Sequence, residues 1–226
     1  MNFFKFGIIG FIILNYIVLG CAKAPSQFSD IPSQSLSKFD QELFARATLH
    51  QQKGQIDSAI VLWNKFLQRN PNSFEARNNL GLLYYANDEI VKAIYHYDQG
   101  LKLRPREDQL KMNLVRALKV QSAILEENRE YDEAIAGLSR IVQLSPVKEQ
   151  EAIDRQIEAL EDQIFKQVKK SDSMEEYQEF LKKYPRSPGN SDEARLWIEN
   201  KLKAKKMGNQ GSLSSDFQPS LATEPR

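Results

Sequence analysis

The residues best suited to chemistry are few in this sequence: two histidines, His50 and His96, and one cysteine, Cys21. Nucleophilic catalysis needs a nucleophile beside a base, and a metal site needs several ligands held together. The chain also contains no GxSxG, HExxH or CxxC motif and no phosphate-binding glycine loop. We therefore expect no enzyme activity, no metal site, no cofactor and no small-molecule substrate, and we interpret both histidines as core-edge or surface residues of helices.

The balance of basic and acidic residues argues against one class of partner, the nucleic acids. The chain has 31 basic and 30 acidic residues and a formal net charge of +1. Nucleic-acid binders usually gather a basic excess on one face, so no nucleic-acid partner is expected. The acidic pairs are interpreted as solvated faces or helix N-terminal charges, and the basic run at 201–206 as a complement to a helix C-terminus or a contact to anionic headgroups.

The N-terminal residues predict where in the cell the protein is located. Residues 1–20 carry one positive charge, Lys5, followed by an apolar run from Phe6 to Leu19. That run is short for a membrane-spanning helix and typical of a secretory signal. The sequence Val-Leu-Gly before Cys21 resembles the bacterial lipobox, in which the cysteine is lipidated and becomes the first residue of the mature protein.

This resemblance implies a protein anchored to a membrane through lipid on Cys21, with residues 21–38 as a flexible tether. Ala22 would follow the lipidated cysteine, and the absence of aspartate there implies the outer membrane, facing the periplasm. The alternative is an uncleaved signal-anchor with an incidental cysteine.

The stretch from Phe74 to Pro105 predicts a pair of closely crossing helices, and any binding residues would have to lie on such helices. With Phe74 as place 1, small residues fill places 8 and 20 and a proline fills place 32. Small side chains let two helices cross closely, and proline cannot continue the second helix. The pattern resembles one tetratricopeptide repeat, a helical hairpin of 34 residues. The matching residues are Leu80, Gly81, Tyr84, Ala93, Tyr97, Leu101 and Pro105.

Neighbouring stretches repeat the pattern over residues 39–146. The first repeat has Ala47, Gly54, Ala59 and Pro71 in register, although Arg46 and His50 depart from it. The third repeat keeps Ala134 and Pro146, but Pro146 lies 41 residues after Pro105, so seven residues have been added. Because seven residues are close to two helical turns, we expect one long helix from Asp108 to about Glu127, with extra turns that project past the repeat stack.

Residues 147–205 predict a degenerate fourth repeat and a capping helix. Apolar residues recur at three- and four-residue steps from Val147 to Lys170, and a short helix follows before Pro185. The capping helix is predicted from Ser191, with Ser191 or Asp192 as its N-cap, and residues 206–226 are predicted to be a disordered tail. The expected fold is therefore all-α: a tetratricopeptide-repeat solenoid of helical hairpins, with about three to four repeats plus this C-terminal helix.

The resemblance also implies a binding groove. In this family the first helices of successive hairpins line a concave groove, mainly through places 2, 5, 9, 12 and 13. An apolar floor, side-chain amides and a basic end suit an extended or helical peptide. The alternative is that Phe44 and Tyr85 pack against a capping segment of the chain itself. The candidate groove residues are Phe44, Thr48, Gln51, Asn78, Leu82, Tyr85, Met112, Arg116 and Lys119.

One subtype of the family clamps a C-terminal carboxylate with Lys, Asn and Arg at set places. Only Asn79 fits here, so that clamp is not expected. The leading hypothesis is an adaptor or scaffold in the cell envelope that binds another envelope protein or peptide. The alternatives are a self-associating structural lipoprotein, with Trp197 at its contact, or a pilotin, pilus-biogenesis or outer-membrane assembly factor.

Overall fold

The structure, a computed structural model, describes residues 36–213, with side chains as far as residue 207. The predicted signal peptide, Cys21 and most of the predicted tether lie outside the described residues. Residues 36–42 and the chain from Leu43 onward belong to two compact units. In the first unit, Ser37 Oγ accepts a hydrogen bond from the Asp40 amide at 3.1 Å and donates one to its carboxylate at 2.6 Å. This serine therefore caps the start of α2 (Lys38–Gln52).

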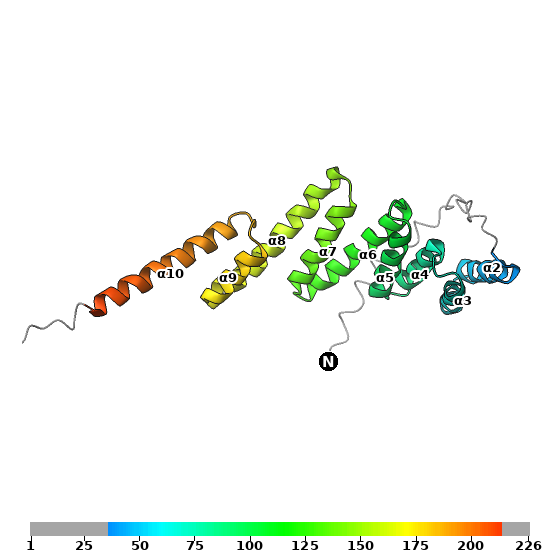
Figure 1. The fold of residues 1–226 in the computed structure, drawn as a ribbon, viewed down its shortest axis with the longest axis horizontal. Coiled ribbons are helices and arrows are strands. Elements are labelled where there is room, and N and C mark those ends of the chain that lie inside the picture. Colours follow the sequence, from blue (N-terminus) through cyan, green and yellow to red (C-terminus); the bar gives the residue numbers. More distant parts are fainter. Residues whose placement is uncertain (1–35, 214–226) are drawn as a thin grey trace, which may run out of the picture. The chain divides into compact units, whose positions relative to one another are not determined.

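From Leu43 onward, the described residues form helices joined by short turns, and no strand occurs in the described range. Consecutive helices pair as hairpins, visible for α4–α5 and α6–α7 in Figure 1. No helix among residues 36–213 is long and apolar enough to cross a membrane. After α2 the helices are α3 (Ile56–Arg69), α4 (Phe74–Ala86), α5 (Ile90–Leu103), α6 (Asp108–Glu127), α7 (Tyr131–Leu144), α8 (Val147–Ser171), α9 (Met174–Lys183) and α10 (Asn190–Leu213).

The turn inside each of the first three hairpins uses one residue in the left-handed region. Gly54 has φ +69°, Asp88 +58° and Arg129 +64°. Glycine adopts this conformation without cost, whereas Asp and Arg do so less readily. Each of these residues lies 17 positions before the proline that follows its hairpin, so the repeat pattern fixes the turn even where the residue type does not favour it.

Most of the repeat-signature residues are buried in the hairpins, whereas the prolines lie outside the helices. Gly81 on α4 lies directly against the Tyr97 ring of α5, because a Cβ added there would lie 2.3 Å from Cε1 of Tyr97. Pro71 and Pro105 follow the ends of α3 and α5, whereas Pro146 directly precedes α8. The buried members are Ala47, Ala59, Leu80, Gly81, Ala93, Tyr97 and Ala134, and Tyr84 is half-buried.

The long third helix is confirmed, since α6 spans Asp108–Glu127. Its extra turns pack on α7, the partner helix of the same hairpin, while Ile124 remains 43% exposed. Ser122 is buried against Gly137 of α7, and Leu125 packs against the core. Gln156 of α8 donates a hydrogen bond to Glu126 at 3.1 Å. This bond between two exposed side chains connects α8 to the end of α6.

The last helix differs from its prediction at both ends. It begins at Asn190, so Ser191 and Asp192 lie in its first turn, and the N-cap assignment is wrong. The Ser191 hydroxyl instead donates to the carbonyl of Tyr184 at 2.7 Å. The helix also continues to Leu213, beyond the predicted start of the tail at residue 206. Residues 214–226 lie outside the described part of the chain.

Side-chain contacts attach α10 to α9 and α8. The rings of Trp197 and Tyr177 are stacked, with centroids 3.9 Å apart and planes 4° from parallel. Lys201 Nζ lies 4.8 Å from the Trp197 ring centroid and 2.7 Å from the carboxylate of Asp172. Trp197 is thus engaged within the chain, which leaves little of it for the self-association that the alternative hypothesis assigned to it.

Candidate protein-binding surface

The predicted groove residues of the first hairpin mainly hold that hairpin together. The Phe44 ring packs edge-on against Trp63 of α3, with centroids 4.8 Å apart. Trp63 Nε1 donates to Oε1 of Gln51 at 3.0 Å, and the Thr48 hydroxyl donates to the carbonyl of Phe44 at 3.0 Å. These contacts favour a packing role for Phe44. The alternative to the groove hypothesis was that Phe44 packs against a capping segment of the chain, whereas here it packs against its own hairpin.

A chain of side-chain amides connects α4 to α6. Gln109 Nε2 donates to Oδ1 of Asn113 at 3.1 Å, and Asn113 Nδ2 donates to Oδ1 of Asn78 at 2.8 Å. Asn113 is only 2% exposed, whereas Asn78 is half-buried and Gln109 is exposed. Because each amide fixes the next, the outer two present defined hydrogen-bonding atoms to a ligand.

The central member, Asn113, was missing from the groove prediction. It lies 34 residues after Asn79, so the repeat register could have identified it as a structural amide. The sequence alone does not show which neighbouring side chain it reaches, because that depends on the spacing of the two helices.

Tyr85 and Arg116 lie beside each other on α4 and α6. Burial raises the pKa of the Tyr85 hydroxyl, while the nearby Arg116 guanidinium opposes that rise. Burial also raises the pKa of Tyr97, again opposed by Arg116. Both phenols are therefore protonated at neutral pH, and the half-buried Tyr85 can contribute both an aromatic face and a hydroxyl group to a ligand.

The exposed part of this surface lies along α6. Met112, Arg116 and Lys119 are spaced i, i+4 and i+7, which places them on one side of the helix. Met112 is 55% exposed, both cations are exposed, and Leu82 of α4 is half-buried. Within the described chain, neither Arg116 nor Lys119 has a carboxylate within 4 Å. We call Asn78, Leu82, Tyr85, Met112, Arg116 and Lys119 the α4–α6 face.

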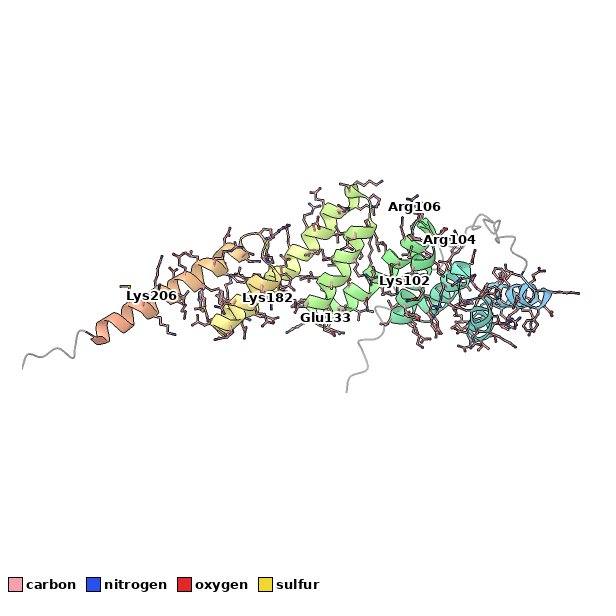
Figure 2. The ribbon with its side chains drawn as sticks, in the orientation of Figure 1. Lys102, Arg104, Arg106, Glu133, Lys182 and Lys206 are labelled. Carbon is pink, nitrogen blue, oxygen red and sulfur yellow. The ribbon has the colours of Figure 1, made fainter. Side chains whose placement is uncertain are left out.

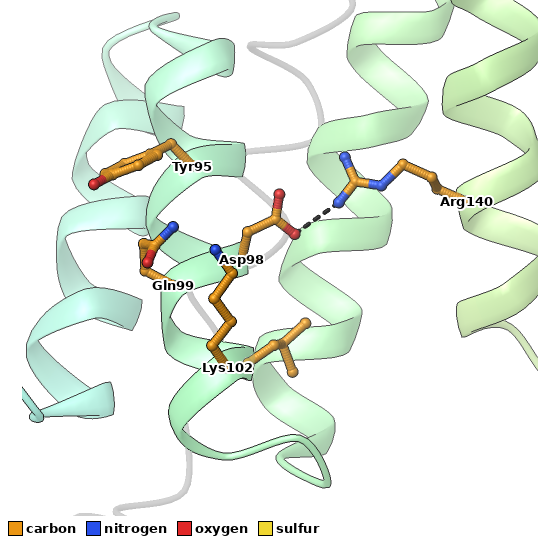
Figure 3. A pocket seen from close by; sticks show the side chains of 6 residues that line it. Tyr95, Asp98, Gln99, Lys102 and Arg140 are labelled. Atoms are coloured by element: carbon orange, nitrogen blue, oxygen red, sulfur yellow. Dashed lines mark hydrogen bonds and ion pairs between the residues drawn. The ribbon is translucent and has the colours of Figure 1, made fainter.

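A separate hollow of about 460 Å³ lies on α5 and α7. None of its lining residues belongs to the predicted groove. Across it, Arg140 Nη2 of α7 contacts Oδ1 of Asp98 of α5 at 2.7 Å (Figure 3). The sequence analysis did not anticipate this hollow, because its two sides come from helices in different repeats. It is lined by Tyr95, Asp98, Gln99, Leu101, Lys102 and Arg140.

His96, one of the residues first considered for chemistry, occupies a packing position. His96 is 8% exposed and stacks on Tyr84, with ring centroids 5.2 Å apart. Burial, assisted by the positive charge of Arg77, lowers the pKa of His96 to about 4. Among the described residues, no three His, Cys, Asp or Glu side chains are grouped closely enough to hold a metal ion.

Comparisons with known proteins identify a repeat family that matches part of the chain. The family model described as tetratricopeptide repeat matches residues 44–108. A search of curated proteins found no match.

Among solved structures, the chain is similar to MamA protein, at 19% identity over 84% of this chain and 100% of that one, with a TM-score of 0.41. It is also similar to the first tetratricopeptide domain of Spaghetti (RPAP3) bound to an HSP90 peptide, at 15% identity, 52% and 92% coverage and a TM-score of 0.39. A third is the Yersinia enterocolitica type III secretion chaperone SycD with a peptide of the translocator YopD, at 18% identity, 55% and 94% coverage and a TM-score of 0.38. The family match and the packed hairpins together show that the described chain has the all-α tetratricopeptide-repeat fold, with the matched repeats at residues 44–108.

Proposed function

We propose that this chain is a protein-interaction scaffold that binds a peptide segment of another protein on the α4–α6 face. The observation that carries this proposal is the exposed row of Met112, Arg116 and Lys119 beside the half-buried Tyr85. Apolar, aromatic and cationic groups that the fold leaves wholly or partly exposed are gathered there on neighbouring helices. Binding hot spots are commonly built from such aromatic and arginine side chains.

The α4–α6 face suits a peptide better than a small molecule. It is a row of exposed side chains along two helices rather than an enclosed cavity, whereas small-molecule sites bury most of their ligand. The amide chain through Asn113 offers hydrogen bonds to a peptide backbone, and Arg116 can form two parallel bonds to one carboxylate. A segment with an apolar residue to pack on Tyr85 and Met112 and an acidic residue to pair with Arg116 would match the face.

We further propose that the scaffold acts in the cell envelope, attached by lipid on Cys21 and facing the periplasm from the outer membrane. The support is the apolar run before Cys21 and its resemblance to the lipobox. Replacing Cys21 with serine should abolish metabolic labelling with palmitate and move the protein to the soluble fraction. Persistent labelling of that variant would contradict the anchor.

The binding proposal is tested by affinity capture from detergent-solubilised membranes with charge-reversal variants. The Arg116→Glu/Lys119→Glu variant alters only exposed groups of the α4–α6 face. Lys166→Glu/Lys170→Glu on α8 is the matched control, because it makes the same charge change at exposed positions.

We expect the native chain and the control to retain one envelope protein that the α4–α6 variant loses. Equal retention by all three proteins would contradict binding on this face. Failure of the native chain to retain any protein would contradict the scaffold proposal itself.

A further inference from the structure

The hollow on α5 and α7 is built from side chains that the proposed function does not use. Asp98 and Arg140 are joined at 2.7 Å, and Asp98 remains 31% exposed and Arg140 43% exposed. The pair fixes the guanidinium at one side of the hollow. On the other side, the side chains of Tyr95, Gln99 and Lys102 extend from successive turns of α5 (Figure 3).

Tyr95 supplies an aromatic surface that the fold does not cover. Its side chain is 54% exposed, although its ring packs edge-on against His96 at 5.2 Å. Val91, one turn earlier on α5, is 69% exposed. Residues four apart on a helix share a face, so Val91 and Tyr95 form a short apolar row that leads into the hollow.

Cationic side chains continue from the hollow past the end of α5. Lys102, Arg104 and Arg106 are exposed, and none has a carboxylate within 4 Å in the described chain (Figure 2). Lys102 alone could be explained as a complement to the helix C-terminus. Arg104 and Arg106, however, lie beyond Leu103, where α5 ends. A chain with a net charge of only +1 therefore concentrates unpaired positive charge at this place.

We propose that this surface, the α5–α7 hollow with Arg104 and Arg106, docks an acidic segment of a partner protein. An apolar residue of the segment packs on Tyr95, and carboxylates of the segment pair with Lys102 and the two arginines. Asp98 excludes a further carboxylate from beside Arg140 and so sets the position of the acidic residues. The site is separate from the α4–α6 face, so the scaffold would bind two segments at once.

The test uses the full chain and a short fluorescein-labelled peptide in which glutamates flank one leucine and one phenylalanine. Fluorescence anisotropy at physiological salt measures its dissociation constant. Exposed ion pairs are weak individually, but reversing two charges replaces attraction by repulsion. We expect Lys102→Glu/Arg104→Glu to weaken binding about tenfold, and Tyr95→Ala to weaken it by a smaller factor.

Two control variants separate this site from general charge and from the α4–α6 face. Lys182→Glu/Lys206→Glu reverses two exposed cations on α9 and α10 (Figure 2) and should change the dissociation constant less than about twofold. The Arg116→Glu/Lys119→Glu variant measures how much of the peptide binds on the α4–α6 face, which also suits an apolar and an acidic residue. It should raise the dissociation constant less than Lys102→Glu/Arg104→Glu does. Circular dichroism melts confirm that each variant is folded.

The proposal is overturned if the native chain shows no saturable binding of the peptide. It is also overturned if the control on α9 and α10 weakens binding as much as the Lys102 variant, because the attraction would then be non-specific. A loss of binding confined to the Arg116 variant would instead assign the acidic segment to the α4–α6 face.

Discussion

Replacing Gly81 with alanine tests the close helix crossing on which the second hairpin depends. An alanine Cβ would lie 2.3 Å from Cε1 and 2.6 Å from Cδ1 of Tyr97, whose side chain is 1% exposed. The ring cannot move aside easily, because buried side chains are close-packed. Overpacking of this kind costs about 1–3 kcal/mol. Alanine recovers about 0.5–1 kcal/mol of helix propensity, so we expect a net destabilisation of about 1–2 kcal/mol.

The sign of the effect should reverse when the ring is removed. In a Tyr97→Ala background both clashing ring atoms, Cε1 and Cδ1, are absent. Gly81→Ala should then stabilise the protein by about 0.5–1 kcal/mol through helix propensity alone. The coupling between the two positions should then be about 2 kcal/mol. Urea unfolding followed by far-ultraviolet circular dichroism of the four proteins measures it.

Ala136→Gly calibrates this comparison, because Ala136 is exposed on α7 and reports the glycine–alanine propensity difference without a clash. The reasoning is refuted if Gly81→Ala stabilises the native chain. It is equally refuted if the substitution has the same effect with and without the Tyr97 ring.

Three further predictions concern buried polar groups. Ser122→Ala should stabilise the chain by about 1 kcal/mol in urea unfolding, because the buried Ser122 hydroxyl has no hydrogen-bond partner; a loss of stability would mean that the hydroxyl is bonded. The depressed pKa of His96, about 4 against an ordinary 6.5, makes the unfolded chain bind more protons between these values. Stability should therefore fall by about 2 kcal/mol as pH drops from about 7.5 to about 5. His96→Gln should remove most of this fall and His50→Gln should not, so equal slopes in all three proteins would contradict the assignment. Tyr184→Phe should cost about 1 kcal/mol in the same assay by deleting the hydrogen bond to Asp132, and an unchanged stability would show that this bond contributes nothing.

The hairpin architecture could be predicted from the sequence because a few residues have strict mechanical requirements. Gly81 must be small where α4 meets Tyr97, and Pro105 cannot extend α5. The seven-residue addition preserved the helical facing, so α6 was located correctly from Asp108 to Glu127.

Features that depend on contacts between helices were harder to predict. The added turns of α6 pack on α7 through Ser122, and Glu126 at the end of α6 accepts a hydrogen bond from Gln156 of α8. Periodicity within one helix cannot reveal either contact. Ser191 resembles an N-cap in the sequence, but its hydroxyl bonds the carbonyl of Tyr184 from the preceding turn. Its role follows from a buried tertiary contact rather than from local sequence preference.

The two candidate surfaces also differ in whether the sequence could predict them. The family's groove places, applied in the repeat register, named Met112, Arg116 and Lys119, and these three residues lie exposed along α6. The register could not locate the hollow, whose Asp98 and Arg140 are 42 residues apart and meet only through the packing of α5 against its neighbours. Nor does the register show that the ring of Phe44, a predicted groove residue, packs against Trp63.

Site-specific photo-crosslinking tests the central proposal, peptide binding on the α4–α6 face, most directly. A photoreactive amino acid replaces Met112 in one protein and Val61 in another, since both side chains are exposed, at 55% and 66%. After irradiation in cells, mass spectrometry identifies the crosslinked peptide. The account predicts one partner peptide crosslinked from position 112 and absent from position 61. Crosslinks of equal yield from both positions, or none from position 112, would contradict it.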